Sequence, residues 1–146
     1  MLHLLLLSTA SSSSSNGSNV TLPFGALIGT TLGNGVNQFL GVPYATQKRW
    51  VAAEEWSTPY TGGSRTALEY GSMCAQGGGG PDGAADLMEG SEDCLFLNIF
   101  APPANGNVNA ATMVFLHGGG MTMGSGNDQN GTALAAKHGV IVVTIN

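Results

Sequence analysis

Apolar positions along the chain predict several strands and one helix. Two short apolar segments between residues 25 and 41 flank the turn signal Gly33-Asn34-Gly35, which predicts an antiparallel hairpin. LFLNIFA, at residues 95–101, predicts a strand that ends at Pro102-Pro103. After a polar Asn/Gly turn, a second strand is expected at about residues 112–117.

The last part of the chain combines a helical pattern with a continuous apolar run. ALAAKHG, at residues 133–139, has helix formers and ends at a glycine, with Lys137 and His138 placed to favour the helix dipole. VIVVTI, at residues 140–145, lacks polar alternation and predicts a strand covered on both faces, suited to the middle of a parallel sheet. Uncovered, it would template aggregation, so we expect the 146 residues to be the front of a longer chain.

Two segments lack a regular pattern and are expected to be mostly loop. Residues 45–75 mix Pro, Gly and Thr with aromatic residues that are expected to act as anchors: Trp50, Trp56 and Tyr60. Between Cys74 and Cys94, four successive glycines and Pro81 exclude regular structure, which predicts a mobile loop closed at its base.

The N-terminus predicts a signal peptide followed by a flexible leader. A leucine run at residues 2–7 precedes the small-x-small pattern Ser8-Thr9-Ala10, although this run is shorter than the usual ~7 to 15 residues. A disordered leader or a misassigned start is the alternative. Residues 8–19 are rich in Ser and Asn and have too little apolar surface to offset the entropy of ordering. We therefore assign residues 1–19 to the signal peptide and leader.

Composition and charge limit the partners. The 42% hydrophobic content is sufficient for the core of one domain. Four Lys plus Arg against nine Asp plus Glu cannot form a basic patch that neutralises several phosphates, so no nucleic-acid partner is expected. No apolar stretch reaches the roughly 18 residues needed to span a bilayer.

Three kinds of feature favour an extracellular location. The first is the signal-like N-terminus. The second is the even number of cysteines. The third is a set of Asn-x-Ser/Thr sequons that are candidate glycosylation sites, at Asn16, Asn19 and Asn130.

Two longer motifs follow each other along the chain. SEDCLFLNIFAP occupies residues 91–102, and VFLHGGGMTMGSG occupies residues 114–126. Together with FLGVPYA before them and VIVVTIN after them, they resemble the type B carboxylesterase family, which includes the cholinesterases and some fungal lipases. The resemblance covers about residues 25–146. It implies that residues 20–146 are the N-terminal part of an α/β-hydrolase fold, with an incomplete central sheet.

The glycine triplet in the second motif has a chemical interpretation. Acyl-transfer enzymes stabilise a developing oxyanion with preorganised backbone N–H groups, and side chains would block the approach. In hydrolases of this class, the loop after an early strand supplies part of that oxyanion hole. The resemblance implies that Gly119 and Gly120 are the donors and that Gly118 gives the loop its geometry. A plain glycine-rich turn is the alternative.

The chain contains no catalytic triad that sequence inspection can find. The resemblance assigns His117 to packing and loop geometry, and His3 and His138 have no visible partner. No Gly-x-Ser-x-Gly elbow occurs in the 146 residues, and the spacing around Ser125 is wrong for one. The nucleophile, acid and histidine are therefore expected beyond Asn146, and the 146 residues alone are expected to be inactive.

The resemblance also implies a disulfide between Cys74 and Cys94. It would close a loop of about 20 residues and stabilise the fold by roughly 3 kcal/mol. In relatives this loop lines or covers the active-site gorge, and Leu87 and Met88 would give such a lid an apolar inner face. A surface loop without substrate contact is the alternative. The loop has no Trp, Tyr or Phe to bind a quaternary ammonium, which disfavours choline esters.

A further implied pair joins Arg49 to Glu92 in a half-buried ion pair that would cost roughly 3–5 kcal/mol to break. A solvated Arg49 is the alternative. Two departures from the family pattern affect local detail. The stretch between Ala45 and Arg49 is shorter than in most relatives, and Met121 replaces the usual aromatic residue after the glycines.

These features predict the N-terminal part of a secreted serine carboxylesterase or lipase that acts on a small-molecule or lipid ester through an acyl-enzyme. No cofactor and no metal are expected. A non-catalytic cholinesterase-like adhesion or binding domain is the alternative, and a truncated pseudogene product is a third. The intact glycines favour the enzyme, because a non-catalytic domain need not keep bare amides there.

Overall fold

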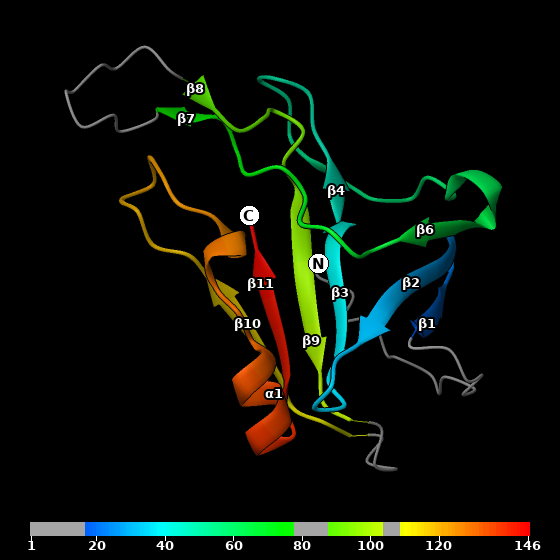
Figure 1. The fold of residues 1–146 in the computed structure, drawn as a ribbon. Coiled ribbons are helices and arrows are strands. Elements are labelled where there is room, and N and C mark those ends of the chain that lie inside the picture. Colours follow the sequence, from blue (N-terminus) through cyan, green and yellow to red (C-terminus); the bar gives the residue numbers. More distant parts are fainter. Residues whose placement is uncertain (1–16, 78–87, 104–108) are drawn as a thin grey trace.

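A computed structural model describes residues 17–77, 88–103 and 109–146, which form a main mixed sheet and two small two-stranded sheets (Figure 1). The main sheet has seven strands, with β6 (Ser64–Thr66) paired to β2 outside the main path. The other six strands follow this spatial order: β1 (Gly17–Leu22), β2 (Gly25–Thr31), β3 (Asn37–Pro43), β9 (Phe96–Ala101), β11 (Ile141–Ile145) and β10 (Thr112–Leu116). Smaller elements are β4 (Ala45–Thr46), β5 (Glu54–Glu55), β7 (Gln76–Gly77), β8 (Met88–Glu89), the 3-10 helices η1 (Thr61–Gly63) and η2 (Gly126–Asp128), and the α-helix α1 (Thr132–His138).

The predicted hairpin is confirmed by β2 and β3. They pair antiparallel through Thr30 with Gln38 and Thr31 with Asn37, and the turn is closed by the Gly35 amide, which donates to the Leu32 carbonyl at 2.8 Å. At Gly41 a bulge shifts the register between β3 and β9. Gly41 has φ +63°, and a Cβ there would lie 2.6 Å from the carbonyl oxygen of Glu69, so a side chain would be strained.

The predicted end of the leader is wrong. Residues 17–19 belong to β1, which pairs antiparallel with β2 from Gly17 opposite Thr30 to Leu22 opposite Gly25. In this strand Ser18 and Val20 are buried and alternate with exposed residues. In a Ser- and Asn-rich segment this alternation is not visible as a hydrophobic pattern. Residues 17–19 are ordered because they pair with the edge of β2, which composition does not predict. Residues 1–16 lie outside the described part.

The strands predicted around the two motifs and at residues 140–145 are confirmed as β9, β10 and β11. β11 pairs parallel with β10 and antiparallel with β9, so it lies inside a mixed sheet rather than a parallel one. The predicted helix is α1, which ends at Gly139 in the left-handed conformation. α1 packs against β9 and β11, and Ala135 lies in the same buried cluster as Phe100 and Val142.

The strand with uncovered faces is β10, not β11 as the sequence suggests. All residues of β10 are exposed, whereas Val142 and Thr144 of β11 are buried. β10 forms the end of the strand order, while its neighbour β11 is paired on both edges (Figure 1).

The irregular segment 45–75 is anchored by two of its three predicted aromatic residues. Tyr60 is buried, and Trp56 packs against the same core cluster, with their ring centroids 6.4 Å apart. Trp50 is 93% exposed, so the prediction that it anchors the segment is wrong. The sequence also did not predict β6, because its pairing with β2 joins distant residues.

Candidate active site

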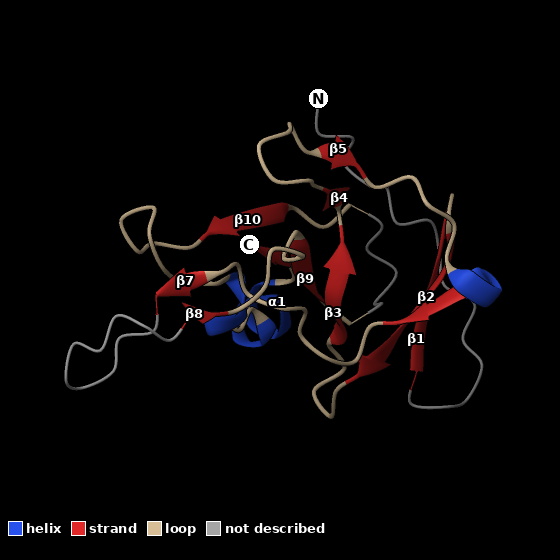
Figure 2. Cartoon of the chain, turned by 90° about the horizontal axis from the view of Figure 1, so that it is seen from above, coloured by secondary structure: helices blue, strands red, loops and turns tan. Residues whose placement is uncertain are grey.

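The glycine loop begins where β10 ends and lies beside β7 in both overall views (Figures 1 and 2). Gly119 has φ +126° and Gly120 has φ +63°, conformations that favour glycine. The carbonyl oxygen of Gly119 accepts hydrogen bonds from the amides of Thr122 and Met123, at 3.1 and 3.2 Å. The loop is therefore a tight turn with a defined backbone path.

The glycines are not equivalent. A Cβ on Gly119 would lie 1.9 Å from the carbonyl oxygen of Met123, which excludes any side chain without a backbone shift. Gly120 is restricted only by its φ, because a Cβ there would meet no described atom within 4 Å. Gly118 has neither restriction. Among the glycines of this loop, Gly119, Gly120 and Gly124 have the positive φ angles, and the part of Gly118 in the loop geometry stays a prediction.

The amides of Gly119 and Gly120 are available to an external acceptor. Both residues are exposed, and neither N–H donates a hydrogen bond to any residue in the described part of the chain. Two adjacent unpaired N–H groups on a constrained turn can stabilise a developing negative charge without reorganising.

Met121 follows these amides with its side chain fully exposed and φ +62°, a left-handed conformation that is uncommon outside glycine.

His117 and Ser125 have structural contacts rather than a catalytic arrangement. His117 Nδ1 lies 2.8 Å from the Gly118 carbonyl oxygen. Ser125 is 2% exposed, and its Oγ accepts from the Asn127 amide and donates to Asn146 Oδ1. It caps η2 in a capping box completed by Asp128.

A polar network centred on Asn146 was not predicted from the sequence. Asn146 Oδ1 also accepts from the Gly126 amide at 2.8 Å, and its Nδ2 donates to the Ser72 carbonyl at 2.9 Å. The Tyr44 hydroxyl donates to the Asn146 carbonyl at 2.6 Å, and burial raises the pKa of Tyr44 above its ordinary value. Apart from polarity at strand ends, the sequence carried no signal for these contacts.

The disulfide and the ion pair differ in their exposure. Cys74 and Cys94 are bonded, with Cα atoms 4.8 Å apart, and Cys94 is 2% exposed. Arg49 Nε lies 3.0 Å from Glu92 Oε1, but the two side chains are 70% and 60% exposed. The prediction of a half-buried pair is therefore wrong, and exposed pairs of this kind stabilise by only about 0–1 kcal/mol.

The base of the predicted disulfide loop is a short ladder between β7 and β8, in which Gln76 pairs with Glu89. Met88 is exposed on β8, and Leu87 lies outside the described residues. The proposed lid surface is thus described at Met88 alone.

The sequons also differ. Asn19 is exposed on β1, and Asn130 is exposed with its Oδ1 accepting from the Thr132 amide at 2.9 Å. Asn16 lies outside the described part.

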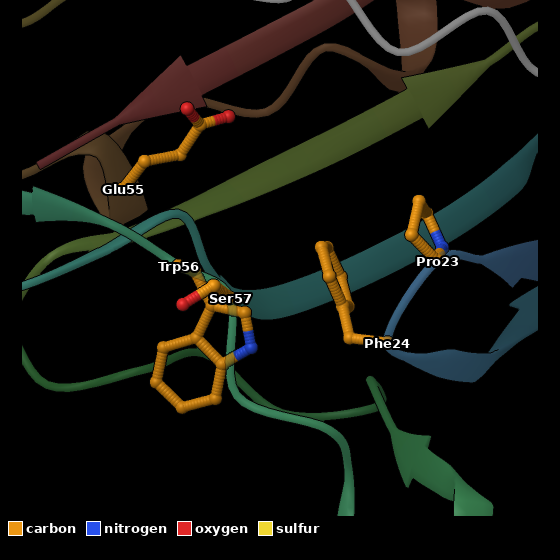
Figure 3. A pocket seen from close by; sticks show the side chains of 5 residues that line it. All are labelled: Pro23, Phe24, Glu55, Trp56 and Ser57. Carbon is orange, nitrogen blue, oxygen red and sulfur yellow. The ribbon is translucent and has the colours of Figure 1, made fainter.

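A separate open cavity of about 320 Å³ lies between the β1–β2 turn and the segment that follows β5 (Figure 3). It is lined by Pro23, Phe24, Glu55, Trp56 and Ser57. None of these residues belongs to the glycine loop. The described residues contain no group of three or more side chains that could hold a metal ion, and no helix among them is long and apolar enough to cross a membrane.

Comparisons with known proteins show which proteins this chain resembles. The carboxylesterase family model matches residues 16–146. The chain is 38% identical over 141 residues to the para-nitrobenzyl esterase of Bacillus subtilis (strain 168), covering 87% of this chain and 27% of that protein. It is 38% identical over 126 residues to the cocaine esterase of Oryctolagus cuniculus, covering 76% and 23%. The solved structure of a thermophilic PNB esterase has a TM-score of 0.72 and 36% identity, covering 88% and 27%.

The chain thus spans about a quarter of the length of these relatives. Its structural neighbours are esterases of the α/β-hydrolase fold, which confirms the predicted fold class. Because the family model matches from residue 16 to residue 146, the chain belongs to the carboxylesterase family.

Proposed function

We propose that this chain supplies the oxyanion-hole loop of a serine carboxylic ester hydrolase, a carboxylesterase or lipase, with the amides of Gly119 and Gly120 as donors. The observation that carries the proposal is the pair of exposed amides, unpaired within the described residues, on a turn that only glycine can form at Gly119. The names of the relatives, a para-nitrobenzyl esterase and a cocaine esterase, support an ester as the substrate.

The reaction uses these amides when charge develops on the substrate. A serine hydroxyl adds to the ester carbonyl carbon while a histidine takes its proton, and the carbonyl oxygen becomes an oxyanion that the N–H groups stabilise. Collapse of this intermediate breaks the bond to the alcohol, which leaves with the proton from the histidine. Water then releases the acid from the acyl-enzyme. The triad belongs to the parent protein outside this chain, since the 146 residues contain no Gly-x-Ser-x-Gly elbow.

A non-catalytic adhesion domain is less well supported. Such a domain has no need for two bare, unpaired amides on a turn that excludes a side chain at Gly119.

We also propose that the protein is secreted and glycosylated at Asn19 and Asn130. The Cys74–Cys94 bond supports secretion because disulfides persist mainly in oxidising compartments, and both asparagines are exposed.

The first test is hydrolysis of a p-nitrophenyl ester by the full-length protein, with covalent labelling by a fluorophosphonate. We expect both activities in the unsubstituted protein. Gly119→Ala should lower kcat by about 10²–10³-fold, because the clash with Met123 displaces one donor. Gly33→Ala is the matched control, since a Cβ there meets no described atom within 4 Å. Unchanged kcat in Gly119→Ala would rule out the assigned donors.

A further inference from the structure

We propose that Gln76 is a positioning residue that fixes the glycine loop, so that Gly119 and Gly120 point their amides at the oxyanion. The inference rests on the proposed function above. Gln76 lies two residues after Cys74 and 48 residues before Gly124, with which its side chain forms two hydrogen bonds.

The side-chain amide of Gln76 pairs with the backbone of Gly124 in both directions. Its Oε1 accepts from the Gly124 amide at 2.7 Å, and its Nε2 donates to the Gly124 carbonyl at 3.1 Å. Nε2 also donates to the Cys74 carbonyl at 3.0 Å. One acceptor and two donors are matched to one N–H and two carbonyls, so a glutamine amide fits this position in a single orientation.

Gly124 transmits this restraint to the donors because it packs directly against the start of the triplet. Gly124 has φ +106°, and a Cβ there would lie 2.4 Å from the Gly118 carbonyl oxygen. The Gly119 carbonyl is bonded within the same turn to the amides of Thr122 and Met123. A shift of Gly124 therefore moves the peptide units that carry the two donors.

Gln76 is itself held by the disulfide region. Its backbone pairs with Glu89 in the β7–β8 ladder, and the neighbouring Ala75 amide donates to the Ser91 carbonyl at 3.0 Å. The Cys74–Cys94 bond fixes the same segment to the chain just before β9. Gln76 thus restrains the loop at Gly124. The Asn146 side chain restrains the next two residues, Ser125 and Gly126, through hydrogen bonds to its Oδ1.

Gln76 acts through Gly124 and has no contact in this structure with the amides of Gly119 or Gly120, so it is not a catalytic residue. Its effect follows from the strong dependence of catalysis on placement. A displacement of about 1 Å in a catalytic group costs about 10²-fold in rate. Removing the Gln76 side-chain amide takes away the two hydrogen bonds that hold the Gly124 backbone in the described part of the chain.

The test compares Gln76→Ala with Gln129→Ala in the full-length protein. Gln129 is the control, because it is an exposed glutamine that directly follows η2. We expect Gln76→Ala to lower kcat by about 10–10²-fold with a small change in KM, and to weaken a trifluoromethyl ketone, whose adduct carries an oxyanion, by a similar factor. Gln129→Ala should change neither. A Gln76→Ala variant with unchanged kcat and inhibitor affinity would overturn the inference.

A second variant guards against a general folding defect. Gln76→Glu keeps the shape and the acceptor toward the Gly124 amide, but places a carboxylate against the carbonyls of Gly124 and Cys74. Its kcat relative to the unsubstituted protein should rise as the pH falls, because the protonated acid regains one donor. A ratio that is constant with pH would contradict the assigned hydrogen bonds.

Hydrogen exchange separates this inference from the proposed function, because it needs no activity. The amides of Thr122, Met123 and Gly124, which are hydrogen-bonded in this structure, should exchange faster in Gln76→Ala than in Gln129→Ala. If the unsubstituted protein hydrolyses no ester, the proposed function and the catalytic role of Gln76 both fail. If exchange is equal in the two variants, Gln76 does not hold the loop.

Discussion

Asn98 shows how one buried side chain joins several elements at the residue scale. Its Oδ1 accepts from the Gly41 amide at 3.0 Å, at the bulge of β3. Its Nδ2 donates to Thr144 Oγ1 of β11 and to Asn127 Oδ1 of η2, each at 3.1 Å. Asn98 is 1% exposed, so bulk solvent does not reach these hydrogen bonds. The LFLNIFA segment therefore carries a polar side chain at one of the buried positions of β9.

Replacing Asn98 is expected to be costly. Asn98→Ala leaves the Gly41 amide and Thr144 without this partner, and should lower the free energy of unfolding by about 2–4 kcal/mol. Asn37→Ala is the control, because Asn37 makes an exposed hydrogen bond to Thr31 and should cost less than about 1 kcal/mol. Urea denaturation measures both. Equal losses in the two variants would show that the buried network is not what stabilises β9.

At the element scale, the ladder of β7 and β8 is too short to be stable by itself, and the disulfide next to it supplies stability. Its two residue pairs are Gln76 with Glu89 and Gly77 with Met88. So short a ladder is marginal alone. The Cys74–Cys94 bond and the hydrogen bonds between Gln76 and Gly124 supply the additional restraint.

We expect the double variant Cys74→Ser, Cys94→Ser to lose roughly 3 kcal/mol of unfolding free energy, because the closed loop restricts the unfolded chain. The unsubstituted protein in a reducing agent should show the same loss by thermal denaturation. The reducing agent should have no effect on the double variant. A melting temperature that is unchanged on reduction would contradict a stabilising role for this bond.

At the scale of the whole molecule, β10 is an exposed edge strand of the main sheet. Each of its residues is exposed, among them Phe115 and Leu116, and in the described part no strand pairs with its outer edge. Exposed apolar edge strands are templates for pairing between chains. The glycine loop follows this strand directly, so the order of the proposed site depends on how β10 is covered.

The chain of 146 residues, expressed by itself, is expected to self-associate through β10. Val114→Lys should reduce this association, because a charge on an edge strand opposes pairing. Val51→Lys is the control, since Val51 is an exposed valine in a loop. Light scattering after size-exclusion chromatography measures the mass. Equal association in both variants would place the contact elsewhere.

The sequence by itself determined the elements whose signals are local: the β2–β3 hairpin from its Gly-Asn-Gly turn, α1 from its helix formers and terminal glycine, and the apolar strands β9, β10 and β11. The motifs and their order along the chain were sufficient to identify the family. Tertiary structure decided what depends on distant partners, because sheet pairing joins residues that no local pattern relates. β1 is ordered by β2, and β11 is covered while β10 is not. A side chain is excluded at Gly119 by the Met123 carbonyl and at Gly124 by the Gly118 carbonyl. Gln76 has its proposed role only because the fold brings Gly124 next to it.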